Sequence, residues 1–184
     1  FTGCVQFNLK NDTNNNQTTE TVDQVITDRY ILNNGLTDYK IVSPENSNDY
    51  EKMAVSELSA LFYESTGVSL ESVKDTNLTH SPDAKYISIG NTTLFESANI
   101  DVDDEATLPD GFQITTKDNT IYLVGGNKHG VVFGVYEFLF RIIKFEQYSV
   151  DSYYIEKAVV DIPLYNYNVI DSPDISGHMA FAGF

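Results

Sequence analysis

Histidines are the first residues whose type and spacing could bind a metal ion. His80, His129 and His178 each lie 49 residues from the next in the sequence. A zinc site built on one helix needs two imidazoles four residues apart, because that spacing places both on the same face. The sequence therefore predicts no zinc site, and it offers no motif for another cofactor.

Acidic side chains offer two other kinds of chemistry. The oxygens of Asp101, Asp103, Asp104 and Glu105 are of the type that binds calcium, but this run lacks the glycine and the distant glutamate of an EF-hand loop. Such a run more often forms a solvated acidic loop than a calcium site, and we interpret it in that way. Glycoside hydrolysis needs two carboxyl groups about 5–10 Å apart. The 27 acidic residues offer many pairs and their spacing singles out none, so a catalytic pair stays open at this point.

Nucleophilic and phosphate-binding motifs are incomplete as well. The sequence contains no G-x-S-x-G elbow around a serine. The segment GGNKHG, residues 125–130, lies between an expected strand and an expected helix, where a phosphate-binding loop would be. It lacks both the Lys-Ser/Thr pair and the G-x-G-x-x-G spacing of such loops. We interpret it as a tight glycine turn that lets the helix begin close to the sheet.

Tyrosines are the remaining candidates for ligand binding. Tyr153, Tyr154, Tyr165 and Tyr167 could stack on sugar rings, although packing in cores and interfaces is the more frequent use of tyrosine. The chain has no tryptophan, which weakens the case for a carbohydrate-binding module. A stand-alone glycan-binding module of a surface lipoprotein stays open as the alternative function, and a small hydrolase stays open as another.

Cys4 is a candidate for lipid attachment. It is the only cysteine, so it cannot form a disulfide within the chain. The opening residues FTGC are similar to the end of a bacterial lipobox, with Phe1 in place of the usual leucine, and a polar segment rich in Asn and Thr follows. An ordinary free or buried cysteine is the alternative. The first interpretation predicts an extracellular protein that is anchored to the cell surface as a lipoprotein.

Composition narrows the class of protein further. The chain has 184 residues, 41% of them hydrophobic, with 11 Phe and 12 Tyr, which is enough to bury the core of one domain. The 27 acidic residues outnumber the 11 basic ones and give a formal net charge of −16, so phosphate backbones are repelled. We therefore exclude nucleic acid as a partner. No apolar run approaches the length that spans a bilayer.

Periodicity and turn chemistry predict the elements that position these residues. Residues 46–67 are expected to form a helix, because Asn48 can cap its start, Glu51 lies three residues later and Gly67 can end it. The other expected elements are strands at 24–34, 37–44, 68–73 and 85–92, a short helix at 93–99, a tight antiparallel hairpin at 111–126 around Asp118-Asn119, a helix at 130–143 and short strands after residue 145.

The helix expected at residues 130–143 is apolar around most of its circumference. Its small and polar residues form one narrow stripe that consists of Gly130, Gly134, Glu137, Arg141 and Lys144. A helix on the surface of a sheet needs an apolar face of little more than 100°. This helix must therefore be buried on at least two sides, and we expect the second side to pack on a following domain. The residues predicted to form that interface are Val131, Val135, Phe138, Leu139 and Ile142.

Three blocks of the sequence resemble the N-terminal domain of certain bacterial glycoside hydrolases. The blocks are NGLTDYKIVSPENSNDYEKMAVSELSALFYESTGVSL, KYISIGNT and DGFQITTKDNTIYLVGGNKHGVVFGVYEFL. The similarity runs from about residue 30 to residue 165 and keeps the order and spacing of the blocks. The enzymes concerned are α-glucuronidases, β-N-acetylhexosaminidases and uncharacterised relatives with the same layout.

This resemblance implies an α+β fold, a mixed β-sheet backed by helices, with a zincin-like topology but without a zinc site. It implies a domain without catalytic residues, placed before the (β/α)8 barrel that carries the active site. The expected division is a polar tether at 1–25, the accessory domain at 26–168, and a linker with the truncated start of the barrel at 169–184. The expected function is a non-catalytic accessory domain of an exported bacterial carbohydrate-active enzyme, a glycoside hydrolase.

One position separates this chain from the hexosaminidases. The resemblance places an arginine just before the glycine of the first barrel strand in those enzymes, where it binds sugar hydroxyls, whereas here Ser176 precedes Gly177. The difference favours the glucuronidase-like or uncharacterised relatives. The expected partners are the following barrel of the same protein, a polysaccharide or oligosaccharide bound through that barrel, and a membrane reached through a lipid.

Overall fold

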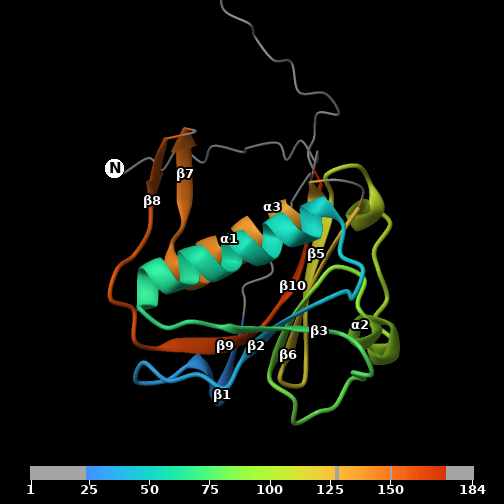
Figure 1. Ribbon diagram of the computed structural model, residues 1–184, viewed down its shortest axis with the longest axis horizontal. Helices are drawn as coiled ribbons and strands as arrows, with labels where there is room; N and C mark the ends of the chain where they lie inside the picture. The colour runs from blue at the N-terminus through green and yellow to red at the C-terminus, as the bar shows by residue number, and fades with distance from the viewer. Residues whose placement is uncertain (1–23, 127–128, 150, 173–184) are drawn as a thin grey trace, which may run out of the picture.

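A mixed six-stranded sheet with helices on both faces forms the centre of the protein (Figure 1). The structure, a computed structural model, describes residues 24–126, 129–149 and 151–172. In chain order the elements are β1 (Gln24–Leu32), β2 (Lys40–Ser43), α1 (Asp49–Thr66), β3 (Glu71–Lys74), β4 (Tyr86–Ile89), α2 (Thr93–Ala98), a 3-10 turn (Glu105–Thr107), β5 (Phe112–Lys117), β6 (Thr120–Gly125), α3 (Gly130–Ile143), β7 (Glu146–Ser149), β8 (Ser152–Tyr154), β9 (Ile162–Asn166) and β10 (Asn168–Asp171).

The strand order of the large sheet is β10-β5-β6-β4-β2-β3. The four strands β6, β4, β2 and β3 are parallel, whereas β5 pairs antiparallel with both β6 and β10. Parallel neighbours require crossover connections, and α1 lies in the crossover from β2 to β3. Two further pairs, β1 with β9 and β7 with β8, are antiparallel. The predicted α+β fold with a mixed sheet is confirmed.

The first long helix begins and ends where its sequence predicts. The side chain of Asn48 accepts from the N–H of Glu51 at 2.9 Å, and the Glu51 carboxylate accepts from the N–H of Asn48 at 2.8 Å. These two bonds form a capping box, which satisfies N–H groups that have no partner within the helix. Gly67 ends α1 with φ 73°, and its N–H donates to the carbonyl of Tyr63. The predicted capping residues are therefore confirmed.

Two predicted strands differ from the structure in detail. The strand expected at 68–73 begins only at Glu71, because its partner β2 pairs Lys40 with Glu71 and offers no strand residue before Lys40. In the region expected to form short strands after residue 145, Pro163 lies inside β9, opposite Tyr30. Proline is tolerated there because β9 belongs to a two-stranded pair, whose outer edge needs no N–H donor.

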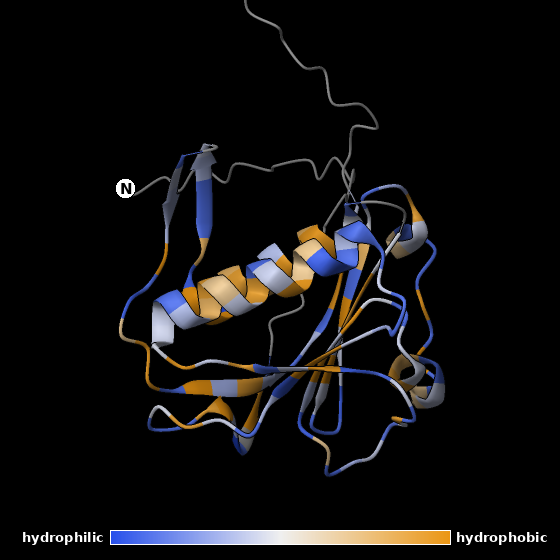
Figure 2. Cartoon of the chain, viewed as in Figure 1, coloured by the Kyte–Doolittle hydropathy of each residue, from blue (hydrophilic) through white to orange (hydrophobic). Residues whose placement is uncertain are grey.

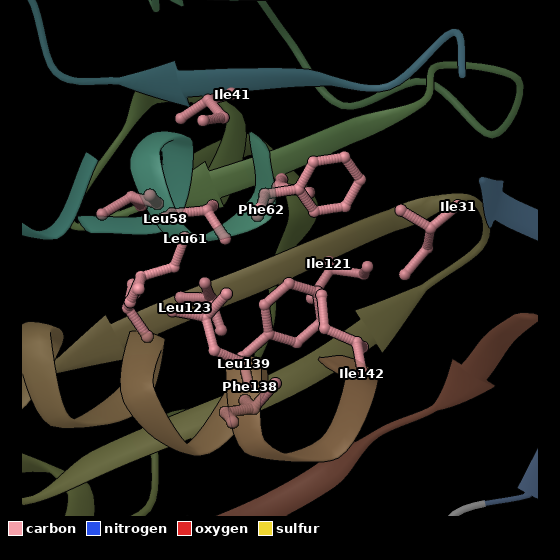
Figure 3. Packing of buried hydrophobic residues seen from close by; sticks show 14 of the residues in the cluster. Ile31, Ile41, Leu58, Leu61, Phe62, Ile121, Leu123, Phe138, Leu139 and Ile142 are labelled. Carbon is pink, nitrogen blue, oxygen red and sulfur yellow. The ribbon is translucent and has the colours of Figure 1, made fainter. Parts of the chain in front are cut away.

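Both long helices cover the same face of the sheet. Side chains from α1, α3 and β6 meet in one core, in which Figure 3 shows Leu61, Leu123 and Leu139 as neighbours. The short helix α2 covers the opposite face, where Leu94 and Ala98 pack with Tyr122. Figure 2 shows α3 as mainly hydrophobic beside α1, which carries hydrophilic residues on its visible face. None of the helices in the described residues is long and apolar enough to cross a membrane.

The nearly all-apolar helix is α3, and its burial on two sides is confirmed. One side packs on β5 and β6, and the other packs on α1. The predicted interface residues all lie in this core, with exposed fractions between 0 and 8%: Val131, Val135, Phe138, Leu139 and Ile142. The second partner of α3 is therefore α1 of the same domain. A contact with a following domain would have to use other side chains.

The small residues of the predicted stripe serve close packing. A Cβ atom added to Gly134 would lie 3.2 Å from the Cβ of Phe112 on β5, so the helix rests directly on that strand. The other end of the stripe is polar, and Glu137 accepts from Arg141 at 2.8 Å, as the spacing predicts. The glycine half of the stripe therefore lies against the sheet, and the polar half forms the ion pair of Glu137 and Arg141.

We expect neighbouring residues of α3 to differ strongly in their effect on stability. Leu139 is fully buried whereas Phe140 is 41% exposed. Leu139→Ala should lower the free energy of unfolding by about 2–5 kcal/mol, because it leaves a cavity in the core. Phe140→Ala should lower it by less than about 1 kcal/mol. Urea unfolding followed by circular dichroism measures both changes, and equal losses would contradict the described orientation of α3.

Candidate functional site

The candidate site is a recess where β4 and β6 end and where α1 and α3 begin. It has a volume of about 470 Å³, and its lining includes Asn48, Glu51, Gly90, Thr107 and Gly125. Open sheets with parallel strands place ligand sites outside the carboxyl ends of those strands. This edge is therefore the first place to look for chemistry. We refer to it as the carboxyl edge.

The carboxylate in the recess is committed to the backbone. Glu51 is 9% exposed, and one of its oxygens accepts the N–H of Asn48 in the capping box of α1. Gly90, with φ 79°, lies against the other oxygen, since an added Cβ would come within 2.3 Å of it. Glu51 therefore holds the start of α1 against the end of β4. Its role in the recess is structural.

Asp75 is a second buried carboxylate with a similar role. It is 5% exposed, and its two oxygens accept the backbone N–H groups of Glu45 at 2.8 Å and Thr93 at 2.9 Å. Thr93 is the first residue of α2, where an anion is favoured by the helix dipole. Asp75 therefore ties the segment after β2 to the start of α2.

The segment 125–130 brings α3 very close to the sheet. A Cβ atom on Gly125 would lie 2.3 Å from the backbone nitrogen of Val131, and one on Gly130 would lie 2.2 Å from the carbonyl oxygen of Gly111. Either contact is too short for any residue with a side chain unless the backbone moves. The predicted close approach of the helix to the sheet is confirmed at Gly125 and Gly130, whereas residues 127 and 128 of the predicted turn lie outside the described residues.

His80 takes part in a cluster that the sequence did not reveal. Its Nδ1 lies 2.8 Å from the hydroxyl of Tyr122, and its Nε2 lies 2.9 Å from a carboxylate oxygen of Asp118. Burial raises the pKa of Tyr122 to about 12, so this phenol keeps its proton at neutral pH. The cluster joins the loop before β4 to the turn of the β5–β6 hairpin. The partners lie 42 and 38 residues away in sequence, so no local pattern indicates them.

The histidines that were considered as metal ligands do not lie together. His80 lies near the start of β6, whereas His129 lies at the other end of that strand, with its Nδ1 3.3 Å from a carboxylate oxygen of Asp110. His178 lies outside the described residues. In the acidic loop, Asp103 accepts the N–H of Glu105 at 2.9 Å. Among the residues that the structure describes, no group of three or more His, Cys, Asp or Glu side chains could hold a metal ion.

The predicted tyrosines separate into two sets. Tyr153 and Tyr154 lie on β8 and are 45% and 51% exposed, whereas Tyr167 is 1% exposed and packs edge-on against Phe138. Tyr165 is partly buried against the main core. Core packing therefore accounts for Tyr165 and Tyr167 but not for Tyr153 and Tyr154. Cys4, the candidate for lipid attachment, lies outside the described residues.

A comparison with known protein families shows to which family the chain belongs. The family model for the N-terminus of glycosyl hydrolase family 67 matches residues 13–138, which is most of the chain. The chain belongs to this family. The matched residues of this family 67 N-terminal domain include the carboxyl edge and most of α3, so the recess is part of the shared domain. A search of the curated proteins found no match.

The chain resembles a small part of two much longer solved structures. One is a family GH115 4-O-methyl-α-glucuronidase, BtGH115A, with specificity for decorated arabinogalactans; it shares 16% identity and a TM-score of 0.44 over 60% of this chain and 14% of its own. The other, CpGH84D, shares 12% identity and a TM-score of 0.43 over 85% of this chain and 24% of its own. This chain thus covers less than a quarter of the length of either structure.

We expect two left-handed glycines of this domain to differ in their tolerance of alanine. Gly67 has φ 73° and open space around an added Cβ, so Gly67→Ala should cost roughly 1–2 kcal/mol of stability from backbone strain. Gly90→Ala carries the same strain and also displaces the Glu51 carboxylate, so it should cost about 1 kcal/mol more through loss of the capping box. Thermal and urea unfolding of the two variants provide the comparison. Equal losses would show that Glu51 is not held against Gly90.

Proposed function

We propose that this chain is the non-catalytic accessory domain of an exported bacterial carbohydrate-active enzyme, a glycoside hydrolase. The catalytic barrel would follow in the same protein and would bind the polysaccharide or oligosaccharide substrate. Membership of the family 67 N-terminal domains supports a place beside a glycosidase catalytic domain. The work of the domain would be to support that barrel and to shape one rim of its substrate cleft.

The use of the two buried carboxylates is the observation that carries this proposal. Acid–base chemistry on a glycosidic bond needs carboxyl groups that can reach the substrate. Glu51 and Asp75 instead accept backbone N–H groups at the starts of α1 and α2. Moving either carboxylate toward a substrate would remove a helix-start contact. This arrangement favours a supporting domain over a hydrolase.

The proposed layout of the chain follows from this function. The sequence places the accessory domain at 26–168, but β1 begins at Gln24 and β10 pairs with β5 as far as Asp171, so the domain would include at least residues 24–171. The residues before it would be a polar tether, and those after it a linker that enters the barrel. The recess at the carboxyl edge and the exposed residues around it are available for a rim of the substrate cleft, because the start of α1 there is held by its own capping box.

A comparative hydrolysis screen tests the proposal. The 184-residue chain and the longer protein encoded by the same gene would be assayed on aryl glycosides and on plant and host polysaccharides. We expect turnover by the longer protein and none by the chain alone, because the reacting carboxylates would lie in the barrel. The substrates that are cleaved would then name the sugar and the linkage.

The control is the longer protein with both acidic residues of its barrel site replaced by the matching amides. This variant should fold and lose turnover, which excludes a contaminating glycosidase. Turnover by the 184-residue chain itself would contradict the proposal, and so would a gene that encodes no catalytic domain after this chain.

We further propose that Cys4 carries a lipid that anchors the protein at the cell surface. The sequence FTGC and the polar segment after it support this assignment. Mass spectrometry of the native protein, extracted from membranes with detergent, should show a diacylglyceryl group on Cys4, and Cys4→Ser should release the protein from the membrane fraction. An unmodified thiol in the native protein would contradict the proposal.

A further inference from the structure

A cleft opens at the edge of the sheet opposite the recess. Its volume is about 620 Å³, within the roughly 300–1,000 Å³ of small-molecule sites. Three segments line it, which are residues 28–39 of β1 and the turn after it, Lys85 just before β4, and Asn119 just before β6. We call it the amino-edge cleft, because β2, β4 and β6 begin beside it.

The wall formed by β1 is irregular in a way that suits a binding site. Asp28 has φ 63°, and the pairing of β1 with β9 shifts its register between Val25 and Tyr30 and again between Tyr30 and Leu32. Such bulges are frequent beside binding sites, because they redirect individual side chains of a strand. Tyr30 lies between the two shifts and keeps 41% of its surface exposed.

Several polar groups of the cleft are held in place by the protein. The side-chain amide of Asn34 donates to the side-chain oxygen of Asn33 at 2.7 Å, and its backbone N–H donates to Asp161 at the same distance. The amide of Asn119 donates to the carbonyl of Pro82 at 2.8 Å, which fixes its plane. Fixed polar groups lose little entropy when a ligand binds.

The base of the cleft combines an aromatic ring with a cation. Tyr39 is 3% exposed, and burial raises its pKa to about 12, so its phenol is neutral at physiological pH. Arg29 lies close enough to this phenol to oppose that rise. The guanidinium also donates to the backbone carbonyl of Asp118 at 3.4 Å. Arg29 is thereby directed across the cleft, where its remaining N–H groups are of the kind that donates to hydroxyl oxygens.

The charges of the cleft balance each other. Arg29 and Lys85 provide two cations, Asp28 and Asp38 provide two carboxylates, and Lys85 pairs with Asp38 at 2.8 Å. A charged ligand would gain little net attraction here, and an anion would be repelled by the net charge of −16 on the whole chain. The lining therefore favours a neutral ligand that offers many hydroxyl groups.

We propose that the amino-edge cleft binds neutral sugar residues of a polysaccharide. The ring of Tyr30 would stack on the apolar C–H face of a sugar, and the fixed side chains of Asn33, Asn34, Asn119 and Arg29 would bond to its hydroxyls. Sugars have these two kinds of surface on one small ring, which matches a cleft with an exposed ring and planar polar groups. The choice of a glycan as the ligand rests on the proposed function.

Binding of the 184-residue chain to neutral polysaccharides tests this inference. The probes are xylan, mannan, galactan and mixed-linkage β-glucan in affinity electrophoresis, followed by calorimetry with oligosaccharides of the polymer that binds. Tyr30→Ala should weaken binding about tenfold, because it removes a stacked ring. Tyr30→Phe should restore most of the affinity, because it keeps the ring. Circular dichroism and thermal unfolding confirm that each variant is folded.

Tyr148 provides the matched control. It is 66% exposed on the β7–β8 hairpin, which Figure 1 shows at the far side of the molecule from β1. Tyr148→Ala should leave affinity unchanged. Loss of affinity in Tyr148→Ala but not in Tyr30→Ala would overturn the proposal and place a glycan on the hairpin. Failure of every neutral polysaccharide to bind would overturn it as well.

The two proposals fail in distinguishable ways. If no polysaccharide binds and only the longer protein hydrolyses its substrate, the proposal of a sugar-binding cleft fails and the accessory role stands. If a polysaccharide binds at Tyr30 and the 184-residue chain itself hydrolyses a substrate, the proposed accessory role fails and the proposal of a sugar-binding cleft stands.

Discussion

The rest of the structure depends on the burial of α3 between α1 and the sheet. This helix buries nine of its 14 residues, and both of its long apolar sides are covered within the same domain. Such packing requires a short distance between backbones, which the glycines at 125, 130 and 134 allow. The position of α3 fixes that of α1, which in turn fixes the capping box of Asn48 and Glu51 beside Gly90. Helix packing therefore determines how the carboxyl edge is built.

The two edges of the sheet use their polar groups differently. At the carboxyl edge, the recess is surrounded by glycines and by a carboxylate that accepts a backbone N–H. At the amino edge, the strands begin beneath an irregular β1, and the polar side chains there contact one another and exposed backbone. The carboxyl edge is thus stabilised by its polar groups, whereas the amino edge presents its polar groups to solvent.

Local patterns in the sequence predicted most of the elements but few of the contacts between them. The capping residues of α1 and the β5–β6 hairpin depend on neighbours within a few residues, and both are confirmed, as is the close approach of α3 to the sheet at Gly125 and Gly130. Periodicity showed that α3 is covered on two sides, but it carries no information about which element covers it, so α1 was missed. The His80 cluster and the amino-edge cleft combine segments far apart in sequence, and no spacing rule indicates them. A zincin-like topology stays a prediction.

The hydrogen bonds of three acidic residues, among the 27 in the chain, carry the proposed supporting role. A catalytic carboxyl group needs an oxygen that can reach the substrate. Glu51 and Asp75 accept such groups at the starts of α1 and α2, where removing a cap costs about 1 kcal/mol. The more exposed Glu64 is bound by Lys157 and Tyr153, which lower its pKa and link α1 to β8 and the segment after it. The three carboxylates thus accept hydrogen bonds that join neighbouring elements of the domain, and this use is what supports the proposed accessory role.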